Sequence, residues 1–327
     1  MSPFTYIQAK DIETALAAAE PREAKFLAGG TNLLDLMKGG IERPLRLVDV
    51  SRLPLGEIAE LPGGSLHIGA TVRNSDAAVH PLVKARYPLL SQALLAGASP
   101  QLRNMATVGG NLMQRTRCHY FYDTAFARCN KRNPGSGCAA LEGYNRIHAI
   151  LGASEKCIAV NPSDMSVALA ALDAVVRVRG PRGERAIPMA EFHRLPGDTP
   201  QRDTNLEHGE LITGIDLPPS RFPKASYLKI RDRASYAFAL VSVAAALDLS
   251  GGAVRAARIA LGGIAHKPWR AQRAEEILTG SNLETNRLRD AAAAALEGAR
   301  PYEHNGFKVE LARRAIVRAV SAAAGVA

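Results

Sequence analysis

All four cysteines of this 327-residue chain lie between positions 118 and 157, and this clustering restricts the possible folds more than any other feature. Cys118, Cys129, Cys138 and Cys157 are separated by ten, eight and eighteen residues. The surrounding segment, 115–160, shows little hydrophobic periodicity and contains Pro134-Gly135-Ser136-Gly137. We therefore expect an irregular insertion that is held together by its cysteines rather than by an apolar core.

The cysteine spacing leaves several kinds of site open. The chain has no Cys-x-x-Cys pair, which argues against a zinc ribbon and against the common ferredoxin arrangement. Thiolates bind soft metals, and a cubane cluster needs four of them, so an iron–sulfur cluster and a structural zinc ion are equally supported by spacing. Disulfides would require an oxidising compartment, and four unrelated buried thiols are the remaining alternative.

Basic residues and two histidines surround the cysteines. The positive charges would offset the negative charge of a cluster. His119 and His148 are expected to pack beside the thiols rather than to bind metal, because four thiols already complete a ligand set. The basic residues are Arg103, Arg115, Arg117, Arg128, Lys131, Arg132 and Arg146.

The length and the order of apolar segments predict an α+β chain of two or three domains. Within the first unit, 1–57, we expect a strand at Lys25–Leu27, a glycine loop, a helix over Leu33–Lys38 and a second strand over Leu45–Val50. A second unit, 58–218, contains the cysteine insertion 115–160. The last unit, 222–327, has three strands followed by three helices, the first helix being expected over Trp269–Leu278. This order predicts a separate domain with a three-stranded antiparallel sheet.

Charge and hydropathy exclude two classes of function. The net charge of +10 is spread along the chain, often near carboxylates, and no known nucleic-acid module is present, so we expect no nucleic-acid partner. The chain contains no run of eighteen apolar residues, so we expect no membrane span. The N-terminus lacks a basic region followed by an apolar run, so we expect no signal peptide on this chain.

Two glycine pairs suggest a site for a nucleotide. Gly29-Gly30 follows the apolar run Lys25-Phe26-Leu27, and Gly109-Gly110 lies in Thr107–Asn111. Glycine lets a backbone approach a ligand closely because it has no Cβ. Neither pair matches the Rossmann or P-loop pattern, so each alone also fits a plain turn.

Longer stretches resemble a known family. KFLAGGTNL at 25–33, TVGGNL at 107–112, Asn161-Pro162-Ser163-Asp164 and Tyr227–Arg231 occur in the order found in the FAD-binding, medium subunits of the xanthine dehydrogenase family of molybdenum hydroxylases. The residues around Cys118 and Cys129–Cys138 are similar to the branch found in bacterial periplasmic aldehyde oxidoreductases. In that branch the FAD subunit also binds a [4Fe–4S] cluster.

The resemblance implies a fold and a set of binding residues. The fold would be the two-part FAD-binding architecture of vanillyl-alcohol-oxidase-like enzymes followed by the family's C-terminal domain. Asp164 would bind the flavin or its ribityl chain, Ile212 would pack on the cofactor, and Lys229 would lie near the isoalloxazine ring. The FAD pyrophosphate would be held by Lys25, Phe26, Leu27, Ala28, Gly29, Gly30, Thr31, Asn32, Leu33, Thr107, Val108, Gly109, Gly110 and Asn111. The cluster ligands would be Cys118, Cys129, Cys138 and Cys157.

The resemblance also implies a role in electron transfer. A large partner subunit with a molybdenum cofactor would convert an aldehyde to a carboxylic acid, and a small partner with [2Fe–2S] clusters would pass the electrons to FAD in a heterotrimer. The chain would reach the periplasm by co-export with a partner, or otherwise stay in the cytoplasm. Two alternatives are a stand-alone flavin oxidoreductase with a structural zinc site and a basic binding protein whose glycine pairs are turns.

Overall fold

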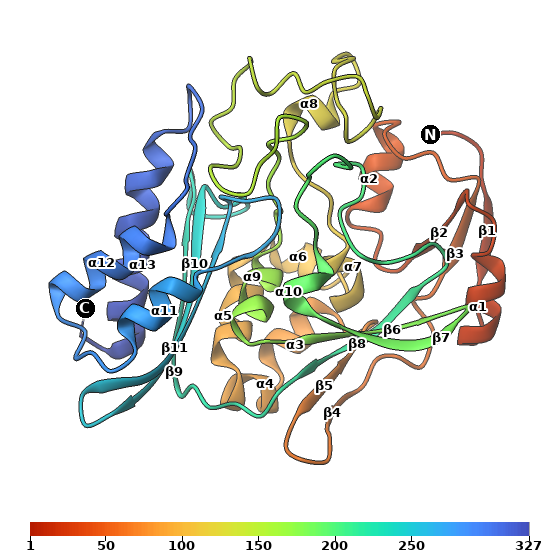
Figure 1. The fold of residues 1–327 in the computed structure, drawn as a ribbon. Helices are drawn as coiled ribbons and strands as arrows, with labels where there is room; N and C mark the ends of the chain where they lie inside the picture. The colour runs from red at the N-terminus through yellow and green to blue at the C-terminus, as the bar shows by residue number, and fades with distance from the viewer. Residues whose placement is uncertain (327) are drawn as a thin grey trace.

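A computed structural model describes residues 1–326 and contains three β-sheets (Figure 1). The first sheet is parallel, and its strands are ordered β1 (Thr5–Gln8), β3 (Arg46–Asp49), β2 (Ala24–Leu27). Helix α1 (Ile12–Ala18) connects β1 to β2 and begins at Asp11, whose carboxylate accepts a hydrogen bond from the N–H of Thr14. Helix α2 (Leu33–Lys38) follows β2, so the Gly29-Gly30 pair lies at the carboxyl edge of the sheet.

The second sheet is antiparallel, and several helices share its buried apolar cluster. Its strands are ordered β4 (Ile58–Glu60), β5 (Leu66–Gly69), β8 (Leu211–Leu217), β6 (Val175–Gly180), β7 (Gly183–Pro188). The apolar side chains of β5, β6 and β8 share one buried cluster with α3 (Asn74–Val79), α4 (Pro81–Arg86), α5 (Pro88–Ala96) and α9 (Asp164–Ala171). Proline lacks an N–H and is tolerated at the first position of a helix, which explains why Pro81 and Pro88 begin α4 and α5.

The C-terminal sheet lies between two helical layers. Its antiparallel strands are ordered β12 (Trp269–Arg270), β11 (Ala253–Gly262), β10 (Val241–Ser250), β9 (Lys224–Ile230). Side chains of β10 alternate: Ala244 and Ala246 face α5 and α9, whereas Val243 and Leu247 face the other layer. That layer consists of α11 (Gln272–Leu278), α12 (Thr285–Ala295) and α13 (Phe307–Ala324).

The C-terminal unit matches the expected α+β domain, with one addition in its sheet. Three strands were expected from the sequence, and the structure adds β12 at the edge. Trp269 and Arg270, which the periodicity predicts as the start of a helix, instead pair with Leu261 and Ala260 of β11. A two-residue strand is too short to show an alternating pattern, so the sequence signal is that of the helix that follows.

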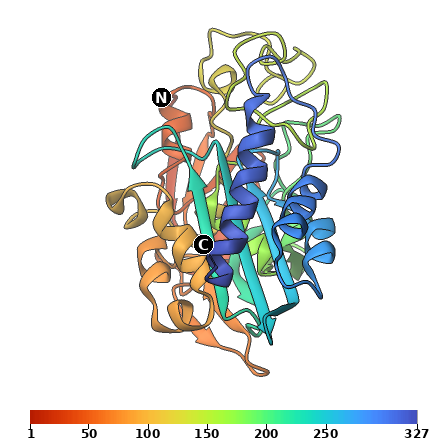
Figure 2. The ribbon, with the colours of Figure 1, turned by 90° about the vertical axis from the view of Figure 1, so that its left-hand side faces the viewer.

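The cysteine segment lies at one end of the molecule, as Figures 1 and 2 both show. Its described helix is the single turn α8 (His119–Tyr122), and the rest is irregular. On one side, Lys308 and Asn305 of the C-terminal unit donate hydrogen bonds to the carbonyl oxygen of His148. On the other side, Tyr122 contacts Asn32 in the loop after β2. The insertion therefore connects the first and last parts of the chain.

Candidate functional site

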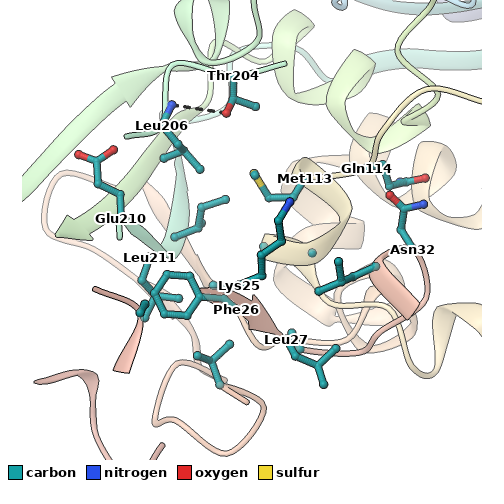
Figure 3. Close-up of a pocket in the computed structure, with 18 of the residues that line it drawn as sticks. Lys25, Phe26, Leu27, Asn32, Met113, Gln114, Thr204, Leu206, Glu210 and Leu211 are labelled. Atoms are coloured by element: carbon teal, nitrogen blue, oxygen red, sulfur yellow. Dashed lines mark hydrogen bonds between the residues drawn. The ribbon is translucent and has the colours of Figure 1, made fainter. Parts of the chain in front are cut away.

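A cavity of about 600 Å³ lies beside both glycine pairs and is the candidate cofactor site (Figure 3). Pockets for small molecules commonly enclose about 300–1,000 Å³. One wall is the end of β2 with the loop that follows it, and a second wall contains Thr107, Gly109 and Gly110. The remaining wall is the segment 201–212, which leads into β8.

The first glycine pair is required by the backbone itself. Gly30 has a φ of +69°, a left-handed conformation that favours glycine. A Cβ at Gly29 would collide with the carbonyl oxygen of Met105, because the two loops pack directly against each other. Gly29 therefore allows the two loops to approach, a reason that differs from the close approach to a ligand inferred from the sequence.

The second glycine pair lies in α7 (Val108–Leu112). Thr107 precedes this helix and accepts a hydrogen bond from the N–H of Gly110 through its hydroxyl, at 3.2 Å. A Cβ at Gly109 would be 3.0 Å from that of Ala70 on the neighbouring chain segment. A Cβ at Gly110 would meet only the Thr107 hydroxyl within 4 Å. Of the two, Gly110 thus keeps open the space on the cavity side.

Most residues expected to bind the cofactor line the cavity. They are Lys25, Phe26, Leu27, Ala28, Gly29, Gly30, Thr31, Asn32, Leu33, Thr107, Gly109, Gly110 and Ile212. Four others of the predicted set, Val108, Asn111, Asp164 and Lys229, do not line it. Val108 is buried in the main core, and the side-chain oxygen of Asn111 accepts hydrogen bonds from Ser163 and Gln114.

Asp164 and Lys229 lie outside the cavity wall and bind each other. The Lys229 ammonium is 2.7 Å from one carboxylate oxygen of Asp164, and the Tyr227 hydroxyl donates to the other at 2.7 Å. Lys229 also donates to the carbonyl oxygen of Ala96. Burial raises the pKa of Tyr227 well above its ordinary value, and the adjacent Asp164 charge adds to this effect. The group joins α9 to β9, and any contact that it makes with a flavin stays a prediction.

No sequence motif marks the third wall of the cavity, the segment 201–212. It is formed largely by Gln201, Arg202, Asp203, Thr204, Leu206, Glu207, His208, Gly209, Glu210 and Leu211. Figure 3 shows Thr204, Leu206 and Glu210 on the opposite side of the space from Leu27 and Asn32. This segment lies about 170 positions after Gly30 in a loop without periodicity, where turn residues and charges are expected anyway.

Charged side chains form a network between the cavity and the insertion. Arg115 lies 2.5 Å from Glu42 and 2.9 Å from Asp203, and all three line the cavity. The opposite oxygen of Asp203 binds the ammonium of Lys131, which is buried two residues after Cys129. Burial raises the pKa of Asp203, but the charges of Lys131 and Arg115 outweigh it and lower the pKa to about 2. Asp203 is therefore a half-buried carboxylate at neutral pH.

The four cysteines gather in one buried cluster. Cys118, Cys129 and Cys157 are buried there with Phe121 and Ile158, and Cys138 packs against the same group. The pKa of Cys118 is raised to about 12, mainly by burial and to a smaller extent by the charges of Cys157 and Cys129. Burial likewise raises the pKa of Cys157 to about 11. The thiols expected to share a ligand are thus brought together, although the segment has almost no regular structure.

His148 lies within the cysteine cluster. Its Nε2 is 3.1 Å from the sulfur of Cys118, while its buried Nδ1 has no hydrogen-bond partner. Burial lowers the pKa of His148 to about 4.

Residues 1–326 contain no group of three or more His, Cys, Asp or Glu side chains that is arranged to hold a single metal ion. Along the same residues, no helix has both the length and the apolar character needed to cross a membrane.

The fold and cavity define an α+β protein with a cavity of the size of a small-molecule site between two glycine loops and the segment before β8. Residues 2–220 match the family model described as FAD binding domain in molybdopterin dehydrogenase, and residues 226–323 match the CO dehydrogenase flavoprotein C-terminal domain. The chain therefore belongs to the FAD-binding medium subunits of the molybdenum hydroxylase family, which are subunits of oxidoreductase complexes.

Individual relatives are similar over nearly the whole chain. The chain is 52% identical to the aldehyde oxidoreductase FAD-binding subunit PaoB of Escherichia coli, over 99% of each chain. It is 27% identical to the carbon monoxide dehydrogenase medium chain of Hydrogenophaga pseudoflava, over 98% of this chain and 96% of that one. Its fold matches the solved CO dehydrogenase of Oligotropha carboxidovorans with a TM-score of 0.78 at 26% identity, over 100% of both chains.

Proposed function

We propose that this chain is the FAD- and [4Fe–4S]-binding electron-transfer subunit of a molybdenum-dependent aldehyde oxidoreductase. Aldehyde and water would be converted to a carboxylic acid on a large partner subunit, and electrons would pass through [2Fe–2S] centres of a small partner to FAD on this chain. The similarity to an aldehyde oxidoreductase subunit over the full length is the observation that carries this proposal. When bound, the flavin would supply the two-electron chemistry that links these centres to a final acceptor.

The cavity residues fit a dinucleotide cofactor. Gly30 and Gly110 contribute backbone on two sides of the space, and Lys25, ion-paired with Glu42, lies in its wall. Phe26, Leu27 and Ile212 supply apolar surface for a ring system. These features support Lys25–Leu33, Thr107, Gly109, Gly110 and Ile212 as FAD-binding residues. The assignment of Val108 and Asn111 rests on the family resemblance, since neither lines the cavity. The predicted roles of Asp164 and Lys229 rest on the family resemblance.

The four cysteines support one shared soft-metal cofactor. Cys118, Cys129 and Cys157 are buried in one cluster, and Cys138 packs against it. A cubane needs four thiolates. The choice of a [4Fe–4S] cluster over a single zinc ion rests on the family resemblance. Arg132 donates to the carbonyl oxygens of Tyr120 and Phe121 and so supports the turn after Cys118.

The proposed assembly and domain organisation follow the family. We place the chain in a heterotrimer with the large and small subunits, and we divide it into units 1–57, 58–218 and 222–327, with the insertion at 115–160. Export to the periplasm would depend on a partner subunit, and otherwise the complex would be cytoplasmic.

Flavin, iron and zinc analysis of the purified full chain tests the proposal. We expect one FAD per chain and about four irons, with a broad absorbance shoulder near roughly 400 nm beside the flavin bands. One zinc and no iron would contradict the cluster and favour the stand-alone flavoprotein with structural zinc. Absence of flavin from a folded, soluble chain would contradict the cofactor assignment itself.

A further inference from the structure

The side chain of Asn32 points toward the insertion and does not cap the helix that it precedes. Asn32 precedes α2, yet its amide makes no capping hydrogen bond to that helix. Its oxygen accepts a hydrogen bond from the N–H of Arg115 at 2.9 Å, and its nitrogen donates to the hydroxyl of Tyr122 at 3.2 Å. Asn32 also lines the cofactor cavity, as Figure 3 shows. Both polar ends of the amide are therefore used at the entrance to the cysteine segment.

Tyr122 is held in place by a residue next to a cysteine. Its hydroxyl accepts a hydrogen bond from Arg117 at 2.6 Å, and the guanidinium of Arg117 lies over the rings of Tyr122 and Phe238. Arg117 directly precedes Cys118, and Tyr122 is the last residue of α8. The position of the hydroxyl that binds Asn32 is thus set by the chain around Cys118.

Apolar packing supports the same junction. Leu36 of α2 belongs to the buried cluster that contains Cys118, Cys129 and Cys157, and it also lines the cavity. The Arg115–Glu42 ion pair joins the start of the insertion to the loop after α2. Figures 1 and 2 both place α8 and α2 at the same end of the molecule. The segment 30–42 is consequently held between the cavity and the cysteines.

We propose that the hydrogen bond between Asn32 and Tyr122 is a positioning contact through which the cysteine insertion holds the FAD-binding loop in its binding conformation. Tyr122 does not touch the cavity and acts through Asn32. The inference rests on the proposed function, since it assigns FAD to the cavity. It goes further by making flavin affinity depend on residues of the insertion that lie outside the cofactor site.

Tyr122→Phe removes the hydroxyl and keeps the ring, and Tyr120→Phe is its matched control. Tyr120 lies in the same helical turn, but its hydroxyl donates only to the carbonyl of Tyr144 within the insertion. FAD binding to the flavin-depleted full chain is measured by fluorescence titration. We expect Tyr122→Phe to raise the Kd about tenfold, which corresponds to about 1.4 kcal/mol, and Tyr120→Phe to leave it unchanged. Equal affinities in the two variants, or tighter binding by Tyr122→Phe, would overturn the inference.

A double-mutant cycle then separates positioning from a general loss of structure. In the Asn32→Ala background the Tyr122→Phe change should have no further effect on Kd, because the partner of the hydroxyl is already gone. If the double variant's Kd rises by the product of the two single-variant factors, Tyr122 acts independently of Asn32, which would contradict the proposal. A wild-type chain that binds no FAD would refute the proposed function. If the chain binds FAD but the Tyr122→Phe and Tyr120→Phe variants have equal affinities, only the positioning role of the Asn32–Tyr122 contact is refuted.

Discussion

Gly29 and Gly110 face the same cavity, but their missing side chains serve different purposes. A Cβ at Gly29 would strike the Met105 carbonyl, whereas a Cβ at Gly110 would meet only the Thr107 hydroxyl oxygen, at 3.0 Å. The sequence predicts both as ligand-approach positions, because a glycine pair after a strand does not reveal what lies opposite it. Only the packing of the 29–30 loop on residues 105–106 distinguishes the two.

Substitutions at these two glycines should therefore separate stability from FAD binding. Gly29→Ala should lower the free energy of unfolding by about 1–3 kcal/mol, as overpacking does in other cores. Gly110→Val should leave unfolding within about 1 kcal/mol of wild type and abolish FAD binding, because its side chain fills the cavity edge. Urea unfolding and flavin content measure the two effects. Gly306→Val, in a helical conformation with no neighbour within 4 Å, is the control for a valine at an open glycine.

Buried histidines make the fold sensitive to acid. Burial lowers the pKa of His193 to about 4 from an ordinary value of 6.5, although its Nε2 lies 3.0 Å from the carbonyl of Leu112. The unfolded chain takes up this proton below pH 6.5, whereas the folded chain stays neutral down to about 4, so stability falls as the pH falls across that window. The loss reaches about 3 kcal/mol. His193→Gln, which keeps a side-chain donor, should lessen the pH dependence of urea unfolding between pH 6.5 and 4. An unchanged slope would contradict the assignment.

At the scale of elements, the cysteine insertion should depend on the proposed cluster more than any other part of the chain does. Outside α8 its residues are irregular, and its small buried cluster is built around the cysteines themselves. Cys129→Ser should lose the iron, because three thiolates do not complete the set. The insertion should then become the preferred site of proteolysis, while the sheets keep their far-ultraviolet circular dichroism and some FAD remains bound. Full iron content in this variant would remove Cys129 from the ligand set.

Some regular elements were predictable from the sequence, whereas β1, α1 and the wall of the site opposite the glycine loops were not. The runs Lys25–Leu27 and Leu33–Lys38 gave β2 and α2 by their periodicity. Asp203 carried no such signal, because it lies in a loop and acquires its role only when Lys131 and Arg115 are folded against it. The contacts of Asp164 with Lys229 likewise join α9 to β9 across 65 positions. Side-chain partners in long-range loops depend on the completed fold rather than on local pattern.

At the scale of the whole molecule, one buried lysine joins the insertion to the C-terminal unit. Lys308 is fully buried at the start of α13 and donates to the carbonyl oxygens of His148 at 2.9 Å and Gly263 at 2.7 Å. Burial lowers its pKa to about 7, and the charge of Arg146 adds to this effect. A neutral amine still has two N–H groups, which are enough for the two carbonyls. The contact therefore survives deprotonation, while the cost of burying a charge disappears.

Stability should consequently rise with pH between 7 and 9. The unfolded lysine keeps its proton up to an ordinary pKa of 10.5, whereas the folded one loses it near 7, so the unfolded state binds more protons across this range. The slope reaches at most about 1.4 kcal/mol per pH unit. Above pH 9 the buried thiols of Cys118 and Cys157 oppose this gain in the cofactor-free chain, because their pKa values are raised in the fold. Lys308→Met keeps the length of the side chain and should flatten the dependence between pH 7 and 9 in urea unfolding. If wild type and Lys308→Met show the same slope, Lys308 remains charged in the fold and the buried contact is that of an ammonium ion.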